Sequence, residues 1–173
     1  MTEREGGGSR SGSGSHAAAA GLTWRIKQRG AGTLVEFSGT LDENANADSL
    51  LDRVRGRVIF DLEQVRRINS SGIREWIEFL RKLAEKVDEL VFVRCSPEVV
   101  TQLNSIYNFR GPARIESFYA PYVCSKCHEE DLKLLTVADP LAVPDFVCDQ
   151  CGGRMDLDEI PDRFFAFARE PGV

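Results

Sequence analysis

The sequence lacks the features that mark exported or membrane-embedded proteins. Its apolar stretches fall well short of the roughly 20 residues that a helix needs to span a bilayer. Residues 1–20 mix charges with glycine and serine and contain no bulky apolar run, so a secretory leader is not expected. We therefore expect a cytoplasmic protein, in a compartment where thiols stay reduced.

Catalytic side chains are also scarce. The two histidines are His16, in the glycine-rich N-terminal stretch, and His128. The chain has neither a Gly-x-Ser-x-Gly motif nor a phosphate-cradling glycine loop. The sequence therefore predicts a protein that is not an enzyme.

Positive charge is sparse in the last third of the chain. Residues 1–120 hold 17 basic and 16 acidic side chains, whereas residues 121–173 hold 5 basic and 11 acidic ones. Nucleic-acid affinity comes largely from Lys and Arg neutralising phosphates, so a nucleic-acid partner is not expected. Such a role would require Lys126, Lys133 and Arg154 to form one basic face.

The N-terminal residues 1–21 are dominated by glycine, serine and alanine. This composition offers too little apolar surface to offset the entropy lost on ordering. We expect a disordered tail.

Residues 22–120 alternate between strand-like and helix-like patterns. Apolar and polar residues alternate from Leu22, which predicts a half-buried strand. A glycine-containing turn follows, and residues 34–37 predict a second strand, so the two strands are expected to form a hairpin. Apolar residues from Ile73 to Val87 recur at three and four positions, which predicts an amphipathic helix beginning at about Ser71. Further expected elements are a short helix between Asp42 and Gly56, strands at 57–62, 90–95 and 113–119, and a helix capped by Ser96 before Pro97. The order β-β-α-β-α-β-α-β predicts an α/β fold with helices covering a mixed β-sheet.

Two segments of this region carry a family resemblance. Val58-Ile59-Phe60-Asp61-Leu62, followed by Ile68-Asn69-Ser70-Ser71-Gly72-Ile73, resembles the signature of STAS domains, the anti-sigma-factor antagonists, and Leu41-Asp42 fits it too. The likeness covers about residues 22–120. It implies a non-catalytic domain that binds a partner protein, often a serine kinase that is itself an anti-sigma factor.

The resemblance also implies a phosphorylation switch in the loop before the amphipathic helix. Ser70 occupies the position of the family's phosphoacceptor, with Ser71 as the alternative, and residues Asn69, Ser70, Ser71, Gly72 and Ile73 form the partner-binding segment. A phosphate there adds nearly two negative charges beside a helix N-terminus. The family usually has Asp before this serine, whereas this chain has Asn69, which leaves open a purely capping role for the segment.

Four cysteines form the strongest motif in the chain. Cys124, Cys127, Cys148 and Cys151 make two C-x-x-C pairs separated by 20 residues. This spacing is typical of a four-thiolate Zn²⁺ site with no open position for water, which is a structural site. A redox dithiol, a disulfide pair and an iron–sulfur site are the weaker alternatives. The arrangement resembles a zinc ribbon over about residues 121–160, and the last domain is expected to span residues 121–173 and to end in a short helix.

Other residues near these motifs have simpler expected roles. His128 is expected to face solvent, and Cys95 is expected to be a small buried apolar residue. The segment with Ile160, Phe164, Phe165 and Phe167 predicts either the packing face of a short helix or an exposed partner patch.

The combined interpretation is a regulatory protein–protein interaction module with a structural zinc ribbon. A scaffold or assembly subunit that is never phosphorylated is the alternative, and Asn69 is the feature that favours it. A nucleic-acid-binding ribbon is a third hypothesis, weakened by the acidic balance.

Overall fold

The computed structural model describes residues 21–169 except 31, 46 and 138–142. Residues 1–20 of the expected tail, with His16, lie outside the described residues. Gly21, the last residue assigned to the tail, forms a parallel bridge with Thr40. No helix in this described part is both long and apolar enough to cross a membrane.

The first part of the chain forms a five-stranded mixed sheet. Neighbouring strands follow chain order, and the first pair is antiparallel while the others are parallel. The strands are β1 (Thr23–Arg29), β2 (Gly32–Leu41), β3 (Gly56–Ile68), β4 (Val87–Val93) and β5 (Arg114–Ile115). The hairpin of β1 and β2 and the mixed α/β class are confirmed.

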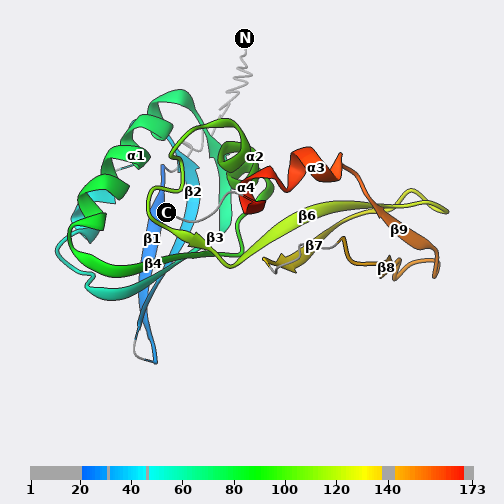
Figure 1. Ribbon diagram of the computed structural model, residues 1–173, viewed down its shortest axis with the longest axis horizontal. Coiled ribbons are helices and arrows are strands. Elements are labelled where there is room, and N and C mark those ends of the chain that lie inside the picture. Colours follow the sequence, from blue (N-terminus) through cyan, green and yellow to red (C-terminus); the bar gives the residue numbers. More distant parts are fainter. Residues whose placement is uncertain (1–20, 31, 46, 138–142, 170–173) are drawn as a thin grey trace, which may run out of the picture.

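Two helices cover one face of this sheet, as Figure 1 shows. They are α1 (Ser70–Ala84) and α2 (Pro97–Ser105), and a short 3₁₀ helix, η1 (Ala47–Leu50), replaces the longer helix expected before Gly56. Val87 opens β4 and does not continue α1 as the periodicity suggested, because the helix ends at Ala84.

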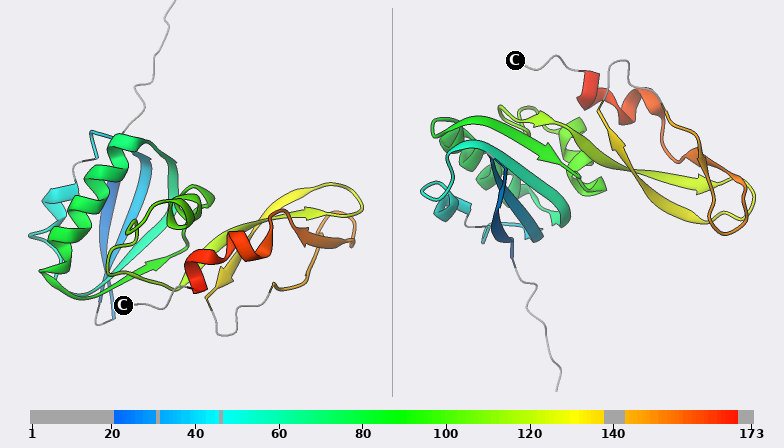
Figure 2. Two further views of the ribbon diagram at one scale, coloured as in Figure 1. Left: turned by 45° about the horizontal axis from the view of Figure 1, so that its top comes forward. Right: turned by 90° about the horizontal axis from the view of Figure 1, so that it is seen from below.

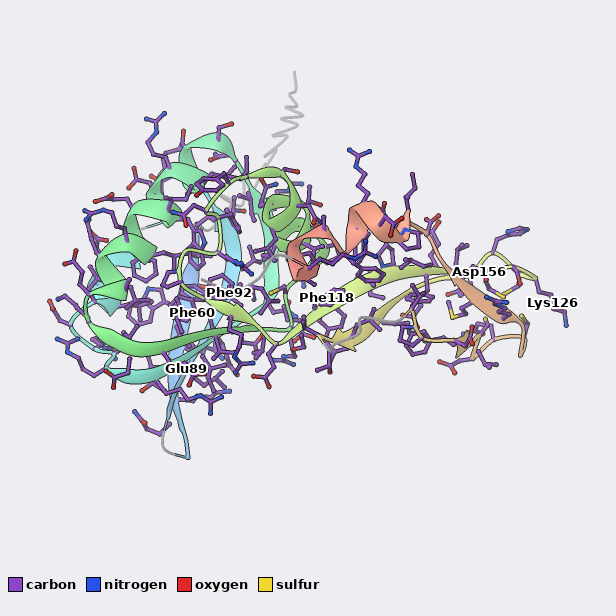
Figure 3. The ribbon with its side chains drawn as sticks, viewed as in Figure 1. Phe60, Glu89, Phe92, Phe118, Lys126 and Asp156 are labelled. Carbon is purple, nitrogen blue, oxygen red and sulfur yellow. The ribbon has the colours of Figure 1, made fainter. Side chains whose placement is uncertain are left out.

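Aromatic side chains fill the space between the sheet and α1. The ring of Phe60 on β3 lies 4.8 Å from that of Phe37 and 5.8 Å from that of Phe92, and Trp76 of α1 lies 5.9 Å from Phe60. All four side chains are buried. This cluster holds α1 against the sheet, and Figure 3 shows Phe60 and Phe92 inside this layer.

The chain changes sheet at Glu116. The expected single strand at 113–119 is two strands, with β5 ending at Ile115 and β6 beginning at Ser117. Glu116 stays tied to the first sheet through its N–H, which donates to the carbonyl of Phe92 at 2.9 Å. The expected domain boundary after residue 120 therefore falls inside β6.

The second sheet is an extended four-stranded unit beside the first, as Figure 1 shows. Its order is β7-β6-β9-β8, and its described pairs are antiparallel. The strands are β6 (Ser117–Cys124), β7 (Glu130–Thr136), β8 (Phe146–Val147) and β9 (Arg154–Leu157).

Two short C-terminal helices, α3 (Pro161–Phe164) and α4 (Ala166–Arg169), join the two sheets. Phe164, Phe165 and Phe167 are buried against Phe118 of β6, with ring centroids 6.2, 5.9 and 5.1 Å away. Asn104 of α2 donates to the carbonyl of Phe164 at 2.9 Å and accepts from the N–H of Phe167 at 3.0 Å. The three phenylalanines are thus a packing face, whereas Ile160 is exposed. Figure 2 shows the helices lying along the second sheet.

Candidate metal centre and binding surface

Four cysteine sulfurs converge at the end of the second sheet that is distant from the first sheet. Cys124 ends β6, Cys127 lies in the turn before β7, and Cys148 and Cys151 lie between β8 and β9. The Sγ atoms of Cys127 and Cys151 are 3.4 Å apart, those of Cys124 and Cys151 3.5 Å, and those of Cys127 and Cys148 3.6 Å. All four lie within 4.8 Å of one another. The predicted residues are therefore brought together at metal-binding distance.

The two C-x-x-C turns have matching backbone geometry. The N–H of His128 donates to the carbonyl of Cys124 at 3.0 Å, and that of Gly152 donates to the carbonyl of Cys148 at 2.9 Å. Both donors directly follow the second cysteine of their pair, and both have positive φ angles, 60° and 67°. Glycine suits this left-handed conformation, whereas a histidine adopts it at some cost. The side chain of His128 is exposed, as expected.

Gly153 allows the chain to pass close to the sulfurs. A Cβ atom at this position would lie 3.0 Å from the Sγ of Cys124, 3.2 Å from that of Cys151 and 2.9 Å from the Cβ of Lys126. Cβ atoms essentially never approach another heavy atom closer than 3.0 Å, and the two Sγ distances are tighter than most Cβ contacts. Packing therefore favours glycine at position 153, and the φ angle favours it at position 152.

The environment of the sulfurs differs within the cluster. Hydrogen bonds from the backbone N–H groups of Cys127 and Lys126 lower the pKa of Cys124 to about 6. A backbone hydrogen bond from Glu129 acts to lower the pKa of Cys127, but the neighbouring sulfurs, Cys151 first, and burial outweigh it and raise the value to about 12. Thiols packed together without a cation cannot all ionise, whereas a metal stabilises the thiolates together.

The donor set limits the metals that fit. A zinc ion held at about 2.3 Å by four thiolates places the sulfurs about 3.8 Å apart, close to the spacing here. Thiolates are soft ligands, which favour zinc and iron–sulfur centres over Mg²⁺ or Ca²⁺. Four protein ligands also complete a tetrahedron, so the arrangement suits a structural metal without a reactive water.

The five residues from Asn69 to Ile73 form the start of α1, which we call the α1 N-terminal surface. Asn69 is the N-cap, and its Oδ1 accepts from the N–H of Gly72 at 2.8 Å. The side chains of Asn69, Ser70 and Ser71 are exposed, Ile73 is partly buried and Gly72 is buried. The first N–H groups of a helix have no partner within it, so this surface can receive an anion or an acceptor.

Gly72 lets α1 begin directly against the end of β2. A Cβ at this position would lie 2.0 Å from the carbonyl oxygen of Leu41 and 2.7 Å from the N–H nitrogen of Asp42. The N–H of Asn69 donates to the same carbonyl of Leu41 at 3.1 Å. The Ser-Ser-Gly sequence thus holds the two serines outward on a helix whose start cannot shift.

Sequence reasoning missed an ion-pair network at the junction of the two sheets. Arg94, just after β4, bonds to the buried Asp61 and lies 3.0 Å from Glu63, both on β3. Glu63 also accepts from the hydroxyl of Tyr119 on β6. An acidic residue inside the apolar run at 58–62 was a signal that such a partner exists.

Two of the three basic residues that a nucleic-acid-binding ribbon would need are paired with acidic neighbours. Lys133 pairs with Asp131 at 2.6 Å, and Arg154 pairs with Asp156 at 3.0 Å. Figure 3 shows Lys126 at the tip of this sheet and Asp156 on β9. Both ion pairs place a carboxylate beside a basic side chain that the nucleic-acid hypothesis would need.

Comparison with protein-family models, curated proteins and solved structures gives no match for this chain. Function is therefore inferred from its own residues and geometry.

Proposed function

We propose that this protein is a regulatory interaction module whose α1 N-terminal surface docks a partner protein. The observation that carries this proposal is the exposure of Asn69, Ser70 and Ser71 at a helix start held in place by Gly72. No group of the described residues covers these serines, and the C-terminal phenylalanines pack elsewhere, on Phe118. The sequence resemblance to STAS domains supports the same role and a serine kinase as the kind of partner.

Phosphorylation of Ser70 is the proposed switch. Ser70 is the first residue of α1, where the helix dipole and free N–H groups favour a phosphate. Arg74 lies one turn further on the same helix face and has no ion-pair partner within the described residues. Ser71 has Glu75 at the equivalent position, so a phosphate there would meet a like charge. The charges favour Ser70 over Ser71 as the acceptor.

We propose that the four cysteines bind one Zn²⁺ with a structural role. The second sheet has a small core, and a metal-linked pair of turns would supply the free energy that apolar burial cannot. Cys124 and Cys148 are buried and Cys151 is partly buried, whereas Cys127 is exposed. Zinc then holds the second sheet in shape beside the first.

A scaffold without phosphorylation is the second candidate function. The side-chain amide of Asn69 donates to Glu43 at 3.2 Å, which places a carboxylate beside the serines. A phosphate on Ser70 would meet that charge. The α1 N-terminal surface would then bind a partner constitutively.

Capture of partners from native cytoplasm separates these two functions. Immobilised wild type, Ser70→Ala and Ser70→Asp are compared, with Ser71→Asp as the matched control, and phosphosites are mapped by mass spectrometry. The switch proposal expects a partner retained by Ser70→Ala, lost by Ser70→Asp and retained by Ser71→Asp. Thermal unfolding of each variant checks that the fold is intact.

The opposite result, in which Ser70→Asp binds the same partners as wild type, supports the scaffold function. If Ser70→Asp keeps every partner and no phosphate occurs on residues 69–71, the switch is excluded. If Ile73→Asp also keeps every partner, the α1 N-terminal surface is not the docking face and both functions fail.

A further inference from the structure

Strand β7 borders the second sheet, as the strand order shows. Leu132 lies opposite Pro121, and Leu134 lies opposite Tyr119. Pro121 has no N–H, and its carbonyl accepts from Asp158 at 3.0 Å, on the β9 side.

Tyr119 also points its backbone away from β7, because its N–H donates to the carbonyl of Cys95 at 2.8 Å. In an antiparallel pair, residues alternate between those that exchange hydrogen bonds with the neighbour and those that do not. Leu132 and Leu134 are therefore in non-hydrogen-bonded positions relative to β6. Their N–H and C=O groups point outward, as do those of Glu130 and Thr136.

Within the described part of the chain, no strand occupies these outward backbone groups, so a further strand could pair with them. No described strand pairs with this edge, and the N–H of Leu132 is met by the carboxylate of its neighbour Asp131 at 2.8 Å. Two of the side chains along this edge are exposed apolar ones, with Leu132 47% and Leu134 48% exposed. Exposed apolar edge strands are templates for pairing with another chain, and natural proteins usually protect them.

We propose that β7 pairs antiparallel with β7 of a second copy of this chain, with Leu132 directly opposite the partner's Leu132. Hydrogen bonding requires outward residues to face each other, so the two-fold axis must fall at a residue and not between two residues. Leu132, Lys133 and Leu134 are the three central positions of β7, where the paired segment is longest. An axis at Lys133 sets two lysines against each other, and an axis at Leu134 sets Lys133 against the partner's Leu135. An axis at Leu132 sets Asp131 opposite the partner's Lys133, twice by symmetry.

The pairing also gives a backbone partner to an N–H group that now bonds only to a neighbouring side chain. The N–H of Leu132 would donate to the partner's Leu132 carbonyl in place of the Asp131 carboxylate. The Oδ1 atom of that carboxylate is then free to bond to the partner's Lys133, while Oδ2 lies 2.6 Å from the Nζ of Lys133 in its own chain. The two Leu132 side chains would meet at the axis, and each Leu134 would lie diagonal to the partner's Leu132 and opposite the partner's Glu130. This pairing is independent of the proposed partner surface on α1.

Sedimentation analysis of the full chain over a concentration series tests the pairing. Wild type is expected to dimerise, and Lys133→Glu is expected to weaken the dimer about tenfold, because two cross-strand attractions become repulsions. The double variant Asp131→Lys/Lys133→Glu restores opposite charges and is expected to restore the homodimer. Mixed with wild type, it should form no heterodimer. Lys27→Glu, on the border strand β1 of the first sheet, is the matched control and should dimerise like wild type.

Amide hydrogen exchange supplies the second measurement, and it does not depend on a variant. The amides of Leu132 and Leu134 should become protected as concentration rises, whereas those of Lys133 and Leu135, which face β6, should be protected at all concentrations. A wild type that stays monomeric up to roughly millimolar concentration overturns the proposal. The proposal is also overturned by a dimer in which the Leu132 and Leu134 amides stay unprotected. A dimer whose stability is the same in wild type and in Lys133→Glu overturns it as well.

Discussion

The side-chain amide of Asn69 donates to the carboxylate of Glu43 at 3.2 Å while its own oxygen caps Gly72 at 2.8 Å. An aspartate at position 69 keeps the cap but has no N–H to donate, and it sets two carboxylates against each other. The amide thus explains why this chain tolerates Glu43 beside the start of α1.

The pKa of Glu43 should report on this contact. It lies below its usual value because of a backbone hydrogen bond first and the Asn69 amide second. The resulting stabilisation is present above the ordinary pKa of 4.5 and is lost as pH falls through the lowered value. We expect Asn69→Asp to raise the pKa of Glu43 in an NMR titration. Glu78, whose pKa is lowered chiefly by Arg81, serves as the internal control and should not change. An unchanged Glu43 would show that the amide contact is not formed in solution.

Gly72 should be intolerant of any side chain. Gly72→Ala places a Cβ about where the Leu41 carbonyl lies, so α1 must move off the end of β2. We expect a loss of about 1–3 kcal/mol in the free energy of unfolding, measured by denaturant titration. Ser71→Ala, at the exposed neighbouring position, should change it by less than about 0.5 kcal/mol. Equal effects of the two substitutions would contradict the close approach seen here.

Tyr119 should stabilise the junction of the two sheets in a pH-dependent way. Its hydrogen bond to Glu63, followed by burial, raises its pKa above the ordinary value of 10. A raised pKa means that the stabilisation is complete below about pH 10 and is lost as pH rises through the folded value. We expect Tyr119→Phe to cost about 1 kcal/mol at pH 7 by urea unfolding, and the difference to shrink above pH 10. Tyr107→Phe, at an exposed site, is the control. A cost that stays constant above pH 10 would argue against the bond.

Metal content should follow the four clustered cysteines and not the fifth. Cys127→Ser is expected to lose bound zinc in elemental analysis, whereas Cys95→Ala should keep about one zinc per chain. Cys95 is buried in the core near Asp61, and burial raises the pKa of its thiol, so it is not a ready ligand. Zinc retention against a chelator should fall as pH falls, because protons compete with the metal for the thiolates. A wild type with far less than one zinc and redox-active cysteines would exclude the structural zinc site.

Local sequence patterns predicted several elements of this structure. The three-and-four periodicity located α1 to within one residue of its start, because a helix with one buried stripe must repeat its apolar residues in that way. Ser96 before Pro97 located the start of α2 for a similarly local reason. The periodicity failed at Val87, where an apolar residue of β4 follows α1 closely and fits the helical pattern by chance.

The sequence by itself determined the four-cysteine cluster, the mixed α/β class and the buried character of Cys95, because short spacings and periodic apolar residues encode them. Only the tertiary structure decided the change of sheet at Glu116, the Glu63–Tyr119 bond and the outward amides of β7. These depend on which residues distant in the chain become neighbours, such as Cys95 beside Tyr119 and Pro121 beside Leu132. A local pattern contains no record of such pairings, since the same alternation of apolar residues suits either sheet.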